Sequence, residues 1–138
     1  MKIKITGLLC FLVIALAISC QSDERIEFNR YYSNGSTVYQ AHCQNCHGTK
    51  GEGFQALIPP LTDSVYLKNN KKLLACLLKT GIKGKLTINN KAFDGEMQAS
   101  GLSPLEIAQV LTYVTNSFGN KSATSTVETV NADLAKCK

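Results

Sequence analysis

The spacing of hydrophobic and polar residues predicts three main helices. The first begins after Gly35, with Ser36 as its N-cap, and continues to residue 47. The second covers residues 69–80 and ends at Gly81, because its leucines fall on one arc of a helix. These leucines are Leu73, Leu74, Leu77 and Leu78.

The third helix has the strongest start signal in the chain. Ser103 is expected to cap it, Pro104 occupies its first position, and Glu106 completes a capping box. We expect this helix to end at Gly119. Its apolar face is formed by Ile107, Val110, Leu111, Val114 and Phe118.

The remaining segments lack a helical pattern. Glycines and the Asn89-Asn90 pair indicate a loop between residues 81 and 97. Residues 20–34 carry mixed charges and polar side chains, which favours a tether, and residues 121–138 form a tail rich in Ser and Thr without a core of its own. The pattern therefore predicts one helical domain over residues 35–120.

Residues 1–19 resemble a bacterial secretory signal. Lys2 and Lys4 supply the positive start, and the apolar run of residues 5–18 is shorter than the roughly 20 residues that cross a bilayer. The sequence Ala-Ile-Ser-Cys at residues 17–20 resembles the lipobox of bacterial lipoproteins. We therefore expect lipidation of Cys20 and anchoring at the periplasmic side of the cytoplasmic membrane or at the outer membrane. Simple cleavage and an uncleaved anchor are the alternatives.

The composition describes a single small domain. The chain has 138 residues, of which 44% are hydrophobic, with 10 glycines and 3 prolines. These values exclude a long disordered or fibrous chain. The formal charge of +5 falls to +3 once Lys2 and Lys4 leave with the signal segment, which does not indicate a nucleic-acid partner.

Residues 43–47, Cys-Gln-Asn-Cys-His, carry the clearest chemical motif. C-x-x-C-H is typical of covalent haem attachment. Two thiols about one helical turn apart can add to the two vinyl groups on one edge of a porphyrin, and His47 can then coordinate the iron. A helical projection places Tyr39, Cys43, Cys46 and His47 on one face.

Two other sites could use such cysteines. A thioredoxin-like pair stands at the start of a helix after a buried strand, whereas here a helix is expected to lead into the motif. A structural zinc site needs four nitrogen or sulfur ligands, but the only other histidine is His42 and no second C-x-x-C is present.

Met97 is the predicted second iron ligand. It is the only methionine besides the initiator, and it lies far enough downstream for the chain to wrap around a haem. His42 is expected to point away from His47 on the same helix and to lie on the surface. The alternative role for Met97 is to fill a gap in the core.

These residues together resemble class I monohaem cytochrome c. The resemblance covers most of residues 35–120, including Gly35, Tyr39, the C-x-x-C-H motif, residues 59–61, Met97 and residues 111–120. It implies an all-α cytochrome c fold of three to five short helices around one covalently attached haem c. It also implies that the first helix crosses the last one at Gly35 and Tyr39, near Val110 and Tyr113.

The resemblance assigns roles to two further residues. The Pro59 carbonyl is expected to accept a hydrogen bond from His47, which orients the ring and strengthens it as a ligand. Leu61 is expected to line the haem pocket. One departure is Gln98, because a proline commonly follows the methionine in this family.

Cys76 and Cys137 are expected to form a disulfide. Two free thiols would be unusual in an exported protein, and a bridge would tie the tail to the second helix. The alternative is a buried Cys76 and a free Cys137.

A haem with histidine and methionine ligands has no open position for a substrate. The sequence therefore predicts a one-electron carrier that exchanges electrons with redox proteins, not an enzyme, and no small-molecule substrate. One alternative is a cytochrome subunit fixed to a dehydrogenase, reductase or oxidase. A further alternative is a haem enzyme or gas sensor in which Met97 leaves the iron.

Overall fold

The computed structural model describes residues 23–137, so the predicted signal segment and Cys20 lie outside the described residues. The chain divides into two units, Met1–Arg30 and Tyr31–Lys138. In the first unit, residues 23–30 are helical. Within the described part of the chain, no helix is both long and apolar enough to cross a membrane.

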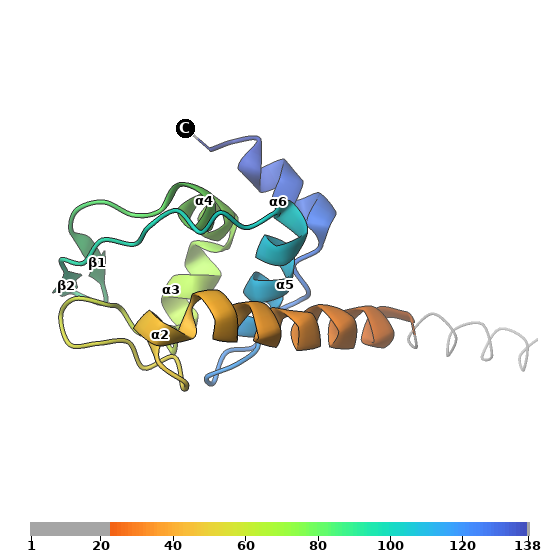
Figure 1. Cartoon of the computed structure of the whole chain (residues 1–138), viewed down its shortest axis with the longest axis horizontal. Helices are drawn as coiled ribbons and strands as arrows, with labels where there is room; N and C mark the ends of the chain where they lie inside the picture. Colours follow the sequence, from red (N-terminus) through yellow and green to blue (C-terminus); the bar gives the residue numbers. More distant parts are fainter. Residues whose placement is uncertain (1–22, 138) are drawn as a thin grey trace, which may run out of the picture. The chain divides into compact units, whose positions relative to one another are not determined.

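The second unit is built from helices with one small hairpin (Figure 1). Residues 31–42 are helical, and strands β1 (Leu86–Ile88) and β2 (Lys91–Phe93) pair antiparallel, with Leu86 opposite Phe93. Since the hairpin is the only sheet among the described residues and its strands have three residues each, the predicted all-α class is confirmed. The other helices are α2 (Gln44–His47), α3 (Ser64–Asn69), α4 (Lys71–Thr80), α5 (Pro104–Val114) and α6 (Val127–Leu134).

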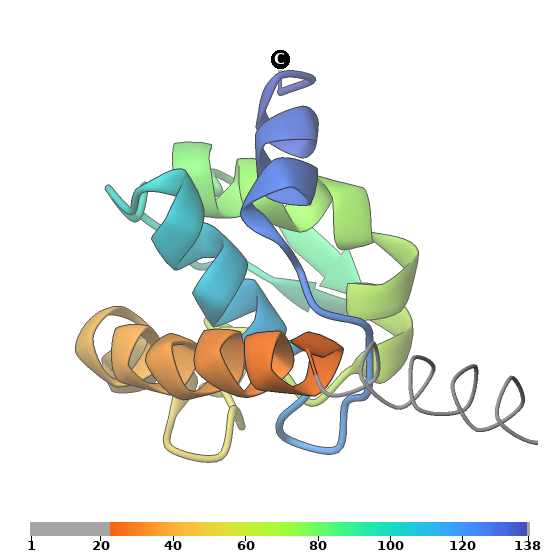
Figure 2. The same ribbon diagram turned by 90° about the vertical axis from the view of Figure 1, so that its right-hand side faces the viewer.

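The helix of residues 31–42 crosses α5 at the predicted point, and Figure 2 shows the two helices in contact. A Cβ added at Gly35 would overlap the backbone carbonyl of Gln109, so only glycine allows this close approach. Next to the crossing, the rings of Tyr39 and Tyr113 lie 5.4 Å apart, centroid to centroid. Phe118 packs on both rings.

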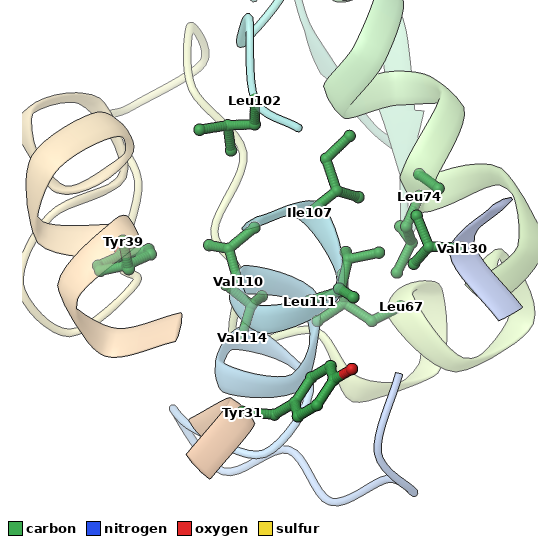
Figure 3. Packing of buried hydrophobic residues seen from close by; sticks show 12 residues of the cluster. Tyr31, Tyr39, Leu67, Leu74, Leu102, Ile107, Val110, Leu111, Val114 and Val130 are labelled. Carbon is green, nitrogen blue, oxygen red and sulfur yellow. The ribbon is translucent and has the colours of Figure 1, made fainter. Parts of the chain in front are cut away.

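Helix α5 supplies the centre of the hydrophobic core (Figure 3). Four of the five residues predicted for its apolar face are buried: Ile107, Val110, Leu111 and Val114. They pack against side chains from the other helices, namely Tyr31, Tyr39, Leu67, Leu74 and Val130. The core thus forms from one central helix surrounded by segments distant in sequence.

The capping box at the start of α5 is present as predicted. The Ser103 side chain accepts from the Glu106 N–H, and the Glu106 carboxylate accepts from the Ser103 N–H. The predicted end at Gly119 is wrong, because α5 stops at Val114. Its last carbonyls are bonded by side chains instead: Thr115 donates to Leu111, Asn116 to Thr112 and Asn120 to Val114.

The predicted start of the first helix at Ser36 is also wrong. The helix runs without interruption from residue 23 to residue 42, and Ser36 lies inside it, with its hydroxyl accepting from the Gln40 amide. Part of the predicted tether, residues 23–34, is therefore helical. Gly35 was expected to precede the helix, but its role is to admit α5, a packing requirement that has no local signature.

Between the first and last helices the structure contains more elements than predicted. The second helix ends at Thr80 as expected but begins at Lys71, and the separate helix α3 precedes it, with Asp63 capping the Tyr66 N–H. The predicted loop contains the β1-β2 hairpin. Asn89 and Asn90 form its turn, both with positive φ, as a two-residue hairpin of this twist requires.

The tail has a core contact that the sequence pattern did not indicate. Helix α6 packs against α4 and α5, and its Val130 is 2% exposed. Before α6, the Ser125 N–H donates to the Thr112 hydroxyl, which bonds back to the Ser125 carbonyl. The predicted disulfide is present, with the Cα atoms of Cys76 and Cys137 5.6 Å apart.

The double variant Cys76→Ser/Cys137→Ser is expected to lose about 4 kcal/mol of unfolding free energy, because the bridge closes a long loop and restricts the unfolded chain. Guanidinium unfolding of the oxidised wild type and the variant measures this difference. Wild-type protein reduced with dithiothreitol serves as the control and should match the variant. Equal stability of the variant and the oxidised wild type would contradict the prediction.

Candidate functional site

A largely apolar cavity of about 390 Å³ lies between the C-x-x-C-H motif, α4, α5 and the segment after β2. Its volume falls in the range of cofactor sites, about 300–1,000 Å³. The predicted site residues all line it: Cys43, Cys46, His47, Pro59, Leu61 and Met97. Residues separated by more than fifty positions in the sequence thus share one cavity.

The two thiols are held at the junction between the first helix and α2. Cys43 lies in a turn after residue 42, but its N–H still bonds the Tyr39 carbonyl at 2.9 Å, and the His47 N–H bonds the Cys43 carbonyl at 2.9 Å. The predicted shared face holds for Cys43, Cys46 and His47. Tyr39 does not line the cavity, because its ring turns toward Tyr113 and Phe118.

His47 has the orientation expected of a metal ligand. Its Nδ1 lies 3.1 Å from the Pro59 carbonyl oxygen, which can only accept, so Nδ1 carries the proton and Nε2 is left free to bind a metal. Burial lowers the pKa of His47, and the bond to Pro59 opposes that shift. Burial therefore favours the neutral ring that coordination requires.

Met97 is held at the cavity by backbone bonds. Its N–H donates to the Ile82 carbonyl at 3.0 Å, and its own carbonyl accepts from the Ile82 N–H at 2.8 Å. Gly81 makes this pairing sterically allowed, since a Cβ there would overlap the Met97 carbonyl. In the family that the sequence resembles, a proline commonly follows this methionine, and here Gln98 takes its place. Met97 is nevertheless held by hydrogen bonds at both its N–H and its carbonyl.

The two remaining predicted residues lie on one short segment. Leu61 lines the cavity, and its N–H donates to the Gly51 carbonyl at 2.7 Å. Its carbonyl accepts from the side chain of Asn120 at 2.7 Å. No local pattern singled out Asn120, which lies in a polar stretch just after Gly119 and is buried only through its tertiary position.

The cavity has a wall that sequence reasoning missed. The hairpin contributes Leu86, Ile88 and Phe93, and Tyr66 of α3 adds a phenol. Alternation of Leu86 and Ile88 with polar Thr87 was the available signal, but the segment is too short for a period of two to be distinguished from a loop. His42 is exposed as predicted, and it also lines the cavity.

Tyr39 supports the motif from behind. Its hydroxyl donates to the carbonyl of Gly48, directly after His47, at 2.6 Å, and the side chain is 1% exposed. Burial, followed by the nearby Cys43, Tyr113 and Glu52, raises the pKa of Tyr39. The phenol is therefore a protonated donor throughout the neutral range.

Tyr39→Phe is expected to lower the unfolding free energy by about 1–2 kcal/mol at pH 7, because the Gly48 carbonyl loses its partner. Since the folded pKa of Tyr39 is raised, its contribution is complete below about pH 10 and is lost as the pH rises toward the folded pKa. Urea unfolding between pH 7 and 11 should therefore show a steeper alkaline loss in the wild type than in Tyr39→Phe. Parallel pH profiles would contradict this.

The geometry does not favour the two other cysteine sites. The motif follows a helix, not a buried strand, and burial with the nearby Cys46 raises the pKa of Cys43 to about 11, which disfavours a reactive thiolate. Among residues 23–137, no three His, Cys, Asp or Glu side chains form a group able to hold a metal ion. The zinc alternative therefore gains no support.

The donor set fits a haem. Two free thiols, Cys43 and Cys46, line an apolar cavity together with His47, whose Nε2 is free, and the thioether of Met97. Thiols can hold the porphyrin edge, imidazole and thioether are both haem-iron ligands, and the apolar walls exclude water. The residues at this cavity thus match the needs of the group that the sequence motif implies.

Comparison with known proteins agrees with this arrangement. The family model described as Cytochrome c matches residues 32–117, which is more than half of the chain. A search of curated proteins finds no relative that matches. The matched region contains the C-x-x-C-H motif, Pro59, Leu61 and Met97. The chain therefore belongs to the cytochrome c family.

Proposed function

We propose that this protein is a class I, one-electron carrier with a single haem c, held covalently by Cys43 and Cys46 and coordinated by His47 and Met97. Membership in the cytochrome c family supports electron transfer and a haem cofactor. The observation that carries the finer proposal is the convergence of the two thiols, the oriented imidazole and the thioether on one apolar cavity.

Each residue has a defined task in this proposal. When bound, the haem supplies an iron that alternates between the ferrous and ferric states. His47 offers Nε2 to the iron while Pro59 holds its other nitrogen. Met97 provides the second ligand from a segment fixed to Ile82, so little has to move when the charge of the site changes.

The surroundings of the cavity suit electron exchange. The walls contributed by α4, α5 and the hairpin are apolar, which keeps solvent reorganisation small. Bound to both His47 and Met97, a haem iron would have no open position for a small substrate, and the partners would be redox proteins. We further propose that the mature protein begins at a lipidated Cys20 and works on the periplasmic side of the cytoplasmic membrane or at the outer membrane.

Production of the full chain in a bacterium that matures c-type cytochromes tests the proposal. The membrane fraction should contain a coloured protein whose mass exceeds that of the lipidated polypeptide by one haem, and the haem should resist acid-acetone extraction. The reduced protein should not bind carbon monoxide. Colourless protein would overturn the proposal, and ready binding of carbon monoxide would exclude Met97 as a stable ligand.

A further inference from the structure

We infer that Asn120 is a positioning residue for His47, acting through the backbone of residues 59–61. The inference rests on the proposed function, since it concerns the same iron ligand. Asn120 does not line the cavity, yet it bonds the segment whose carbonyl orients the histidine ring.

Two hydrogen bonds and the backbone between them link Asn120 to His47. Asn120 Nδ2 donates to the Leu61 carbonyl at 2.7 Å, and the Pro59 carbonyl, two residues earlier, accepts from His47 Nδ1 at 3.1 Å. On its other side, the Leu61 N–H donates to the Gly51 carbonyl at 2.7 Å. Leu61 is therefore held from both sides, and the bond to Asn120 spans 59 residues of sequence.

The segment between these bonds is stiff enough to transmit position. Pro59 and Pro60 each have a fixed φ, and the residue before a proline is restricted as well. Neither proline has an N–H with which to secure the segment. The backbone pairing of Ile58 with Phe54 therefore holds this segment at its start, and the hydrogen bonds at Leu61 hold it at its end.

The hydrogen bonds of Asn120 show that it does more than cap a helix. Its one NH₂ group bridges two carbonyls, Leu61 from one segment and Val114 at the end of α5, at 2.7 and 3.0 Å. Its Oδ1 is buried with no partner among the described residues, an arrangement that costs stability. A threonine such as Thr115 caps a carbonyl of the same helix without that cost, but one hydroxyl proton cannot serve two carbonyls.

Loss of this bridge should change the iron ligand in a defined direction. A Pro59 carbonyl held close to Nδ1 makes the imidazole a stronger donor, which favours ferric iron. Without the bond from Asn120, residues 59–61 gain freedom and the Pro59 bond weakens on average. The reduction potential should then rise, and the Nδ1 proton of His47 should exchange more rapidly with solvent.

Asn116 provides a matched control. It is also an asparagine just beyond α5, and its Nδ2 donates to the Thr112 carbonyl at 2.9 Å. Its Oδ1 accepts from the Ser122 N–H, and these hydrogen bonds do not reach residues 59–61. Asn116→Leu therefore removes a cap of the same helix without touching Leu61. Any effect common to both positions reflects α5 alone.

The experiment uses haem-loaded protein and three variants, Asn120→Leu, Asn120→Asp and Asn116→Leu. Leucine removes both donors at similar volume, and aspartate is the second variant in case leucine prevents folding. We expect the Leu61 amide and the His47 Nδ1 proton to exchange at least tenfold faster in reduced Asn120 variants than in the wild type, measured by NMR. Voltammetry should also give a higher reduction potential in Asn120→Leu, which adds no charge, with Asn116→Leu unchanged in both readouts.

Equal exchange and potential in the Asn120 and Asn116 variants would overturn the inference, as would a potential that does not move. Wild-type protein that carries a covalent haem, together with such a result, would leave the proposed function intact and refute only the role of Asn120. Wild-type protein without haem would instead refute the proposed function, and this role with it.

Discussion

Met97→Ala is expected to abolish the optical charge-transfer band that a thioether bound to ferric haem iron produces, and to open the reduced protein to carbon monoxide. The thioether at residue 97 lines the cavity and its backbone is paired with Ile82, so alanine leaves the same loop without a sulfur. Loss of the sulfur also removes a ligand that favours ferrous iron, so the reduction potential should fall. Absorption spectra of the oxidised protein and of the reduced protein with carbon monoxide measure both effects.

Met97→Leu separates ligation from packing. Leucine fills a similar volume, and such hydrophobic exchanges usually cost less than about 1.5 kcal/mol. If Met97 binds iron, Met97→Leu should lose the band as completely as Met97→Ala while remaining the more stable of the two. Retention of the wild-type spectrum in Met97→Leu would show that Met97 only fills the core.

Gly35→Ala is expected to destabilise the protein by about 3 kcal/mol or more, near the upper end for overpacking. Helix propensity alone would stabilise the variant, since alanine in a helix is favoured over glycine by about 1 kcal/mol. The packing effect prevails because the added Cβ would overlap the Gln109 carbonyl and lie 2.9 Å from Tyr113 Cβ. Backbone atoms of α5 cannot yield without separating the two helices.

Asn34→Ala is the matched control for this change. It introduces the same side chain at the neighbouring exposed position of the same helix, where helix propensity alone should act. Guanidinium unfolding should find Asn34→Ala at least as stable as the wild type and Gly35→Ala far less stable. Equal stability of Gly35→Ala and the wild type would contradict the close crossing.

Most residues of the candidate site could be predicted, because short sequence motifs define their chemistry. The spacing of Cys43, Cys46 and His47 defines a donor set within one helical turn, and a single candidate methionine leaves little choice for the second ligand. The hydrogen bond from His47 to Pro59 and the place of Leu61 followed from the family resemblance, and both geometries are present. The hairpin wall and Asn120 escaped prediction, because their burial depends on neighbours distant in sequence.

Local sequence accounts for the features whose physical cause lies within a few residues: the capping box at Ser103, the stop at Gly81, the helix leading into Cys43 and the donor set of the motif. The folded structure was needed to find where α5 ends, why Gly35 lies inside a helix and how Val130 gives the tail a core contact. The reason is that the close helix crossing, the burial of Val130 and the bond from Asn120 to Leu61 take their free energy from contacts between segments distant in sequence. Local propensity, at about 1 kcal/mol or less per residue, yields to them.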